Sequence, residues 1–232
     1  MKVQSDIFNR YNEEFHLFFI LQYQIYSLSL KKQLNLVTMI ELIPTKEEIM
    51  SFYEFPNTLS QEGKELLIPA FGKYKVERNG LVLKPGHISH CVYQVLTGVI
   101  RQFYYKGDKE ISEYFALAKD KFFCVESFIK QCPSKVGIMS IEPTTLLGLK
   151  YEPLMELCKQ HLEIEIFYRA CLEESLIISQ QRVFSLQFET AQERYNYLIE
   201  NRPGIIQRVP SNYIASYLGI TSETLSRIKG KK

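Results

Sequence analysis

Short apolar runs alternate with turn residues between about residues 70 and 151. The runs are rich in β-branched and aromatic side chains, and pairs such as Asn79-Gly80 and Pro85-Gly86 separate them. Short strands with turn chemistry between them indicate an antiparallel sandwich or jelly-roll. Residues 99–105 and 109–115 flank a Lys-Gly-Asp turn, which predicts a β-hairpin.

The pattern changes to a helical period after Tyr151. A short helix is expected at residues 152–160, and a longer one at 164–184, where apolar residues recur every three or four positions without Gly or Pro. Such a helix, apolar on more than one side, needs two surfaces to pack against. One is its own β-domain, and we expect the other to be the same helix of a second copy. Burial wholly within one chain is the alternative. The residues expected at the dimer seam are Phe167, Ala170, Cys171, Ile177, Gln181 and Phe184.

A capping box opens the next helix. Thr190 and Glu193 have the spacing in which the hydroxyl and the carboxylate each bond the other residue's amide. Arg202-Pro203-Gly204 ends this helix. Residues 186–232 are therefore expected to form a compact helical domain.

The segment 209–230 predicts a helix-turn-helix. Ser211 is the expected N-cap of the first helix, and Ala215 is small enough to let a second helix cross closely. Gly219 supplies a left-handed corner, and Thr221 or Ser222 caps the second helix.

The outward face of this second helix has the chemistry of base edges and phosphates. Arginine can donate two hydrogen bonds to guanine, and glutamate can accept one from cytosine. An ordinary helical hairpin with a solvated polar face is the alternative. The residues expected to contact DNA are Ser211, Thr221, Ser222, Glu223, Thr224, Ser226, Arg227 and Lys229.

The order of a small β-domain, a long helix and a helix-turn-helix resembles the Crp/Fnr family of transcription regulators. The segments that carry the resemblance are Lys84-Pro-Gly86, YQVLTGVIR, FYRACLEESLIISQQRV and RVPSNYIASYLGITSETLSRIKG. It implies an α+β chain with a cyclic-nucleotide-binding-like β-roll over 39–160, a dimerisation helix over 161–185 and a DNA-binding domain over 186–232. The sequence ends at Lys232, directly after the recognition helix, so the family's complete β-wing is not expected. Lys229, Lys231 and Lys232 can still contact phosphates.

One departure from the family concerns the effector. Its cyclic-nucleotide binders carry Gly-Glu and then Arg-Ser or Arg-Thr to hold the ribose and the phosphate. Here Cys124-Val125 and Lys135-Val136 occupy those places, and lysine lacks the bidentate fork of arginine. We therefore expect that the effector is neither cAMP nor cGMP, and that the β-roll senses an unidentified signal or none. The effector-pocket residues are Cys124, Val125, Glu126, Ser127, Lys135 and Val136.

Composition and charge fit this interpretation. The 232 residues are 46% hydrophobic and 23% charged, as in ordinary globular proteins. Residues 186–232 hold seven Lys/Arg and four Glu, a net +3, which leaves −1 for the residues before them. The five cysteines are scattered without a CxxC pair, and no histidine or cysteine spacing indicates a metal or haem. No nucleophile–base motif indicates an enzyme.

The first 38 residues stand apart. Residues 15–30 are apolar, but a membrane-spanning helix needs roughly 20 apolar residues. An added amphipathic helix, a membrane-surface segment, or residues upstream of a true start at Met39 all remain open, and we favour the last.

The sequence thus predicts a cytoplasmic, homodimeric DNA-binding regulator that is neither an enzyme nor membrane-bound. Its expected partners are double-stranded DNA, a second copy and, for an activator, RNA polymerase. The alternative is a small-molecule-binding β-roll whose helical tail makes protein contacts.

Overall fold

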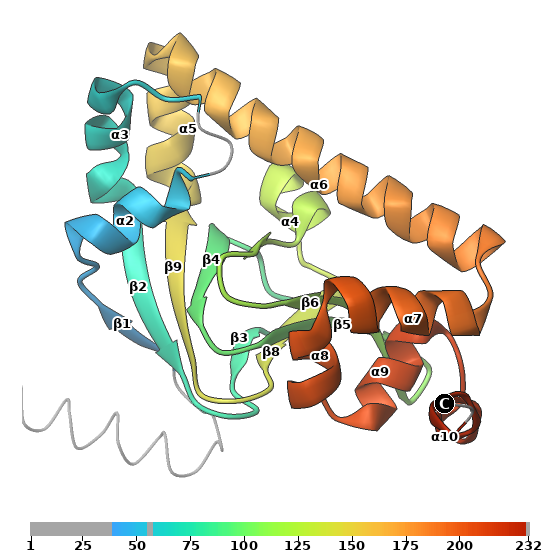
Figure 1. The fold of residues 1–232 in the computed structure, drawn as a ribbon. Coiled ribbons are helices and arrows are strands. Elements are labelled where there is room, and N and C mark those ends of the chain that lie inside the picture. The colour runs from blue at the N-terminus through green and yellow to red at the C-terminus, as the bar shows by residue number, and fades with distance from the viewer. Residues whose placement is uncertain (1–38, 55–57, 231–232) are drawn as a thin grey trace, which may run out of the picture. The chain divides into compact units, whose positions relative to one another are not determined.

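The computed structural model describes residues 39–54 and 58–230 (Figure 1). The interpretation of residues 1–38 as an extension, and the expected phosphate contacts of Lys231 and Lys232, lie outside this range. The strands are β1 (Ile40–Leu42), β2 (Phe71–Val76), β3 (Leu81–Leu83), β4 (Cys91–Thr97), β5 (Ile100–Lys106), β6 (Lys109–Ala116), β7 (Lys121–Phe122), β8 (Val136–Ser140) and β9 (Thr144–Lys150). The helices are α2 (Lys46–Phe52), α3 (Gln61–Leu67), α4 (Val125–Lys130), α5 (Tyr151–Gln160), α6 (Leu162–Phe188), α7 (Ala191–Asn201), α8 (Pro203–Arg208), α9 (Ser211–Leu218) and α10 (Ser222–Lys229), with a 3₁₀ turn at Ile68–Ala70.

The strands form two antiparallel sheets, in the orders β1-β2-β9-β4-β7 and β3-β8-β5-β6. The expected α+β class, with its antiparallel β-roll, is confirmed. Strands β5 and β6 form the hairpin that the sequence predicts, and a bulge interrupts their register between Gln102 and Phe103. Among the described strands, β6 has a neighbour on one side only, so it is an edge of its sheet there.

Alternating side chains of the five-stranded sheet enter two different cores. On β9, Leu146 packs between the sheets with Tyr93 and Ile138, whereas Leu147 and Leu149 lie in a cluster with residues of the helices. Because successive strand residues point to opposite faces, this run of leucines is buried on both sides.

The first half of α6 packs into this outer core, together with α2, α3 and α5. Phe167 of α6 is fully buried, and its ring lies 6.3 Å from Phe52 and 5.7 Å from Tyr53, centroid to centroid. Cys171, one turn further along, is 7% exposed in the same cluster. Both residues therefore face their own chain, which corrects their expected place in a dimer seam.

Helices α7 to α10 follow α6 and pack together at the C-terminal end of the chain. The Thr190–Glu193 capping box is present in both directions. Pro203, expected only to end the preceding helix, also starts α8. The core of these helices includes Leu198, Ile214 and Leu218, and it is continuous with Val99 and Phe115 of the β-roll.

A bilayer-crossing helix is not found in the described part of the chain, because none there combines the necessary length with a sufficiently apolar run.

Candidate DNA-binding face and effector cavity

Helices α9 and α10 meet at a glycine corner. Gly219 has φ = +70°, and the next amide, of Ile220, donates to the Ala215 carbonyl at 3.0 Å. Residues with a Cβ are strained at such a φ. The glycine thus fixes the turn between the two helices, as predicted.

The cap predicted for α10 is confirmed at Thr221, whereas that of α9 is wrong. The Thr221 hydroxyl accepts from the Thr224 amide at 3.2 Å. At α9 the N-cap residue is Pro210, which has no side-chain hydrogen bond, and Ser211 is the first helical residue. The Ser211 hydroxyl is left for other contacts.

The predicted DNA-contacting residues lie on the exposed side of this helix pair. Leu225 and Ile228 of α10 are buried against the domain core, which turns the polar side outward. Thr224 and Lys229 are partly buried. The exposed members are Ser211, Thr221, Ser222, Glu223, Ser226 and Arg227.

Hydrogen bonds connect several members of this set. The Lys229 ammonium donates to the Ser211 hydroxyl at 2.9 Å, which joins the end of α10 to the start of α9. A terminal nitrogen of Arg227 donates to the Thr224 hydroxyl at 3.2 Å. The fold therefore gathers residues far apart in sequence into one surface, which we call the DNA face.

Glu223 is an ionised acceptor on this face. Its hydrogen bond with the Thr221 side chain, followed by a backbone hydrogen bond at the helix start and the charge of Arg227, lowers the pKa of its carboxyl. A carboxylate repels phosphates but can accept a hydrogen bond from the amino group of cytosine. Glu223 is thus suited to base reading.

Other basic residues of the C-terminal domain are bound within the chain. Arg194 donates to the Leu218 carbonyl at 2.8 Å, and Arg202 pairs with Asp120. Arg208 pairs with Glu142 through both carboxylate oxygens. The net charge counted from the sequence therefore overstates the positive charge that the folded domain offers to a polyanion.

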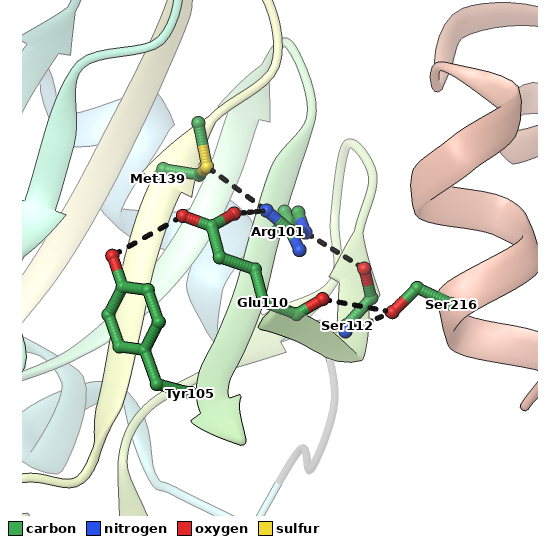
Figure 2. Close-up of polar contacts among 6 residues, drawn as sticks. All are labelled: Arg101, Tyr105, Glu110, Ser112, Met139 and Ser216. Atoms are coloured by element: carbon green, nitrogen blue, oxygen red, sulfur yellow. Dashed lines mark hydrogen bonds and ion pairs between the residues drawn. The ribbon is translucent and has the colours of Figure 1, made fainter. Parts of the chain in front are cut away.

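Helix α9 is held against the free edge of β6 (Figure 2). The Ser216 hydroxyl accepts from the Ser112 amide at 3.0 Å and donates to the Glu110 carbonyl at 3.3 Å. Edge strands present such unpaired groups, which otherwise invite another strand. A single hydroxyl satisfies one donor and one acceptor here and fixes α9 on the sheet.

Arg101 of β5 contacts both β6 and α9 next to these hydrogen bonds. Its side chain is fully buried, and it donates to the Ser112 hydroxyl at 2.8 Å and to the Glu110 carboxylate at 2.6 Å (Figure 2). Its guanidinium carbon lies 3.8 Å from the ring centroid of Tyr213 on α9, within cation–π range. The helix-turn-helix is therefore packed on the β-roll by α9, while the polar side of α10 stays exposed.

The predicted effector-pocket residues all line one cavity, of about 1210 Å³, bordered by β6, α4, α6 and α9. They differ in their freedom to bind a ligand. Ser127 is engaged structurally, since it donates to the Cys132 carbonyl at 2.6 Å and accepts from the Ser89 amide. Glu126 pairs with Lys130 on the exposed side of α4.

Cys124 and Val136 approach each other at the cavity wall. The Cys124 sulfur lies 3.9 Å from the Val136 carbonyl oxygen, and the Ser134 hydroxyl donates to the same oxygen at 2.8 Å. Burial raises the pKa of the Cys124 thiol to about 11. It is a neutral thiol at pH 7, which supplies no charge to hold a phosphate.

The sequence did not reveal Glu113 as a cavity residue. Register pairs Gln102 with Tyr114 and Phe103 with Ser112, so Glu113 is the extra residue of the β6 bulge. It lines the cavity, and desolvation raises the pKa of its carboxyl, opposed by the charge of Arg182. A bulge cannot be located from alternation alone, and no motif marked this position.

Comparison with solved structures identifies the architecture. FixK2 from Bradyrhizobium japonicum has a TM-score of 0.59 at 20% identity, over 68% of this chain and 82% of that one. A putative cAMP-binding regulatory protein from Silicibacter pomeroyi has 0.57 at 16%, over 81% and 88%. The c-di-GMP responsive global regulator CLP of Xanthomonas campestris has 0.56 at 18%, over 72% and 88%.

The chain has the fold of these regulators. The fold expected from the resemblance to the Crp/Fnr family is thereby confirmed. No protein-family model matches the sequence, and the search of curated proteins returned no match.

Within this regulator fold, the second half of α6 carries an uncovered apolar stripe. Ile177 is 57% exposed, Phe184 58% and Phe188 72%, and Gln181 is exposed between them. These positions follow the four- and three-residue steps of a heptad seam. Three of the predicted dimer residues, Ile177, Gln181 and Phe184, lie on this stripe, and a fourth, Ala170, is partly buried on the first half of the helix. The prediction missed Phe188 because α6 is longer than predicted and ends at that residue.

Proposed function

We propose that the protein is a homodimeric, cytoplasmic transcription regulator that reads a palindromic operator with α10. The observation that carries the proposal is the exposed DNA face on a helix pair whose opposite side is buried. The cavity beside α6 is its proposed effector site, and RNA polymerase is its partner if it activates.

The stripe on α6 supports the dimeric form of the proposal. A C2 dimer presents two copies of α10, and helix-turn-helix dimers read half-sites separated by one helical turn, about 34 Å. Ile177 and Phe184 are the side chains that would become buried in the seam between the two α6 helices.

Arg227→Ala is expected to weaken operator binding by about 1–3 kcal/mol and to relax preference at one base pair, since Arg227 is the exposed arginine of α10. Fluorescence anisotropy on an operator and on variants with one base pair changed measures both effects. Lys159→Ala is the control, because it also removes one exposed positive charge, from α5, which packs with α3 and α6. Equal loss on every sequence would mean that Arg227 contacts phosphate only.

The operator itself comes from selection of bound sequences out of a random DNA pool, with and without small molecules extracted from cells. Enrichment of a two-fold symmetric sequence is the expected result. If no sequence is enriched in either condition, the protein is not a sequence-specific regulator.

We expect cAMP and cGMP at 1 mM, roughly 100 times a 10 µM dissociation constant, to leave the melting temperature unchanged. A ligand at that excess stabilises a protein by about 2.7 kcal/mol. The exposed Lys135 and the neutral Cys124 thiol give a cyclic phosphate no buried cation at these positions. Differential scanning fluorimetry provides the measurement, and a saturable upward shift would contradict the expectation.

The alternative, a small-molecule-binding β-roll with a protein-binding tail, makes different predictions. It expects a monomer in solution and no sequence enrichment. The docking of α9 on β6 leaves the polar residues of α10 exposed, so this contact does not by itself favour the alternative.

A further inference from the structure

Arg208 is an arginine placed next to the DNA face but paired with the β-roll. It is the last residue of α8, three positions before Ser211. Three residues span at most about 11 Å of chain. The backbone of Arg208 therefore lies within about 11 Å of that of Ser211, which accepts the Lys229 hydrogen bond, and just before the helix that crosses the DNA backbone in helix-turn-helix complexes.

Its partner comes from a distant part of the chain. Glu142, in the loop between β8 and β9, accepts from Nε of Arg208 at 3.3 Å and from a terminal nitrogen of the same guanidinium. This two-point arrangement is the geometry in which arginine also holds a phosphate. The carboxylate thus occupies the donors that a DNA phosphate would need.

The pair is suited to exchange. The side chains of Arg208 and Glu142 are 36% and 32% exposed, and partly solvated ion pairs contribute little to stability. Arg202, which pairs with Asp120 and donates to the Phe115 carbonyl at 3.2 Å, is held more firmly and is less suited to leave. Of the two arginines of this domain that the structure pairs with a carboxylate, Arg208 is the one that can change partner at the lower cost.

We propose that Arg208 is a further phosphate-binding residue of the DNA face, and that Glu142 of the β-roll competes with DNA for it. The inference rests on the proposed function. In the protein without DNA, the Arg208–Glu142 ion pair lowers the affinity for DNA. The β8–β9 loop, which carries Glu142, thereby controls that affinity.

The test is the substitution Glu142→Gln in the full-length protein, with Glu62→Gln as the matched control. Glu62 is an exposed carboxylate on α3, so the control makes the same change of net charge away from the DNA face. Glu142→Gln is expected to raise affinity about two- to fivefold, the range that an exposed ion pair is worth. The plot of log affinity against log salt should steepen by about 0.9 for each added phosphate contact, and hence by about 1.8 for the two subunits of the dimer.

The gain should require Arg208 and should carry no sequence information. In the double variant Glu142→Gln/Arg208→Ala, affinity should equal that of Arg208→Ala alone. A phosphate contact raises binding to the operator and to a non-specific duplex by the same factor.

Three results would overturn the inference. Glu142→Gln could match the Glu62→Gln control, its gain could persist without Arg208, or its gain could appear on the operator alone. Each differs from failure of the proposed function, in which the wild-type protein selects no sequence and Arg227→Ala changes nothing.

Discussion

Phe167→Ala is expected to lower the free energy of unfolding by about 3–5 kcal/mol. The side chain is fully buried in one cluster with Phe52, Tyr53 and Phe71. Its ring packs against those of Phe52 and Tyr53, and these contacts attach α6 to the rest of the β-roll domain. Removing the ring leaves a cavity lined by these side chains, and this rigid cluster has little freedom to collapse into it. Urea denaturation followed by circular dichroism measures the change.

Phe184→Ala is the matched control, since it makes the same chemical change on the same helix. Phe184 is 58% exposed, and within the chain its ring contacts Phe188 at 5.0 Å between centroids. Its loss should cost much less, and the deficit should grow at protein concentrations where dimers form. If both variants lower the free energy of unfolding by the same amount at every protein concentration, then Phe167 and Phe184 do not differ in burial as described.

Phe184→Glu is expected to separate the dimer and to weaken operator binding by about 30-fold or more. A carboxylate in the middle of an apolar seam must be desolvated without a partner, and the anchors of such seams cost 2 kcal/mol or more when removed. Analytical ultracentrifugation at micromolar concentration should show a monomer. The salt dependence of DNA binding should fall to about half its slope, because one subunit makes half the phosphate contacts.

Ser179→Glu controls for the added charge in the measurement of oligomeric state only, because Ser179 also lines the cavity beside α6. Ser179 is exposed on α6 two positions from Ile177, and hence on nearly the opposite side of the helix. It should leave the dimer intact. If Phe184→Glu remains dimeric with unchanged affinity, α6 is not the dimer seam.

Much of the fold follows from local sequence. The hairpin of β5 and β6, the capping box at Thr190, the corner at Gly219 and the cap at Thr221 each depend on neighbouring residues, so composition and spacing were enough to predict them. The order of β-roll, long helix and helix pair follows from these elements in turn.

The polar side of α10 was also readable from spacing. Leu225 and Ile228 alternate with polar residues at helical period, so the inward side and the outward side were separable. The wrong N-cap at Ser211 is an error of one position, since Pro210 takes the non-helical N-cap place and Ser211 begins the helix. A serine at the first helical turn is compatible with either position, and only the backbone angles distinguish them.

Which side of α6 is buried was decided by the tertiary structure. The helix is apolar on more than one side, so its period could not separate Phe167, which packs into its own chain, from Phe184, which does not. The same limit applies to Glu113, which enters the cavity through a bulge, and to Arg208, whose charge is matched by a carboxylate 66 residues away in sequence. Local pattern determined the elements and the chemistry of their faces. The partners of those faces were decided only by packing, because they depend on contacts between residues that the sequence places far apart.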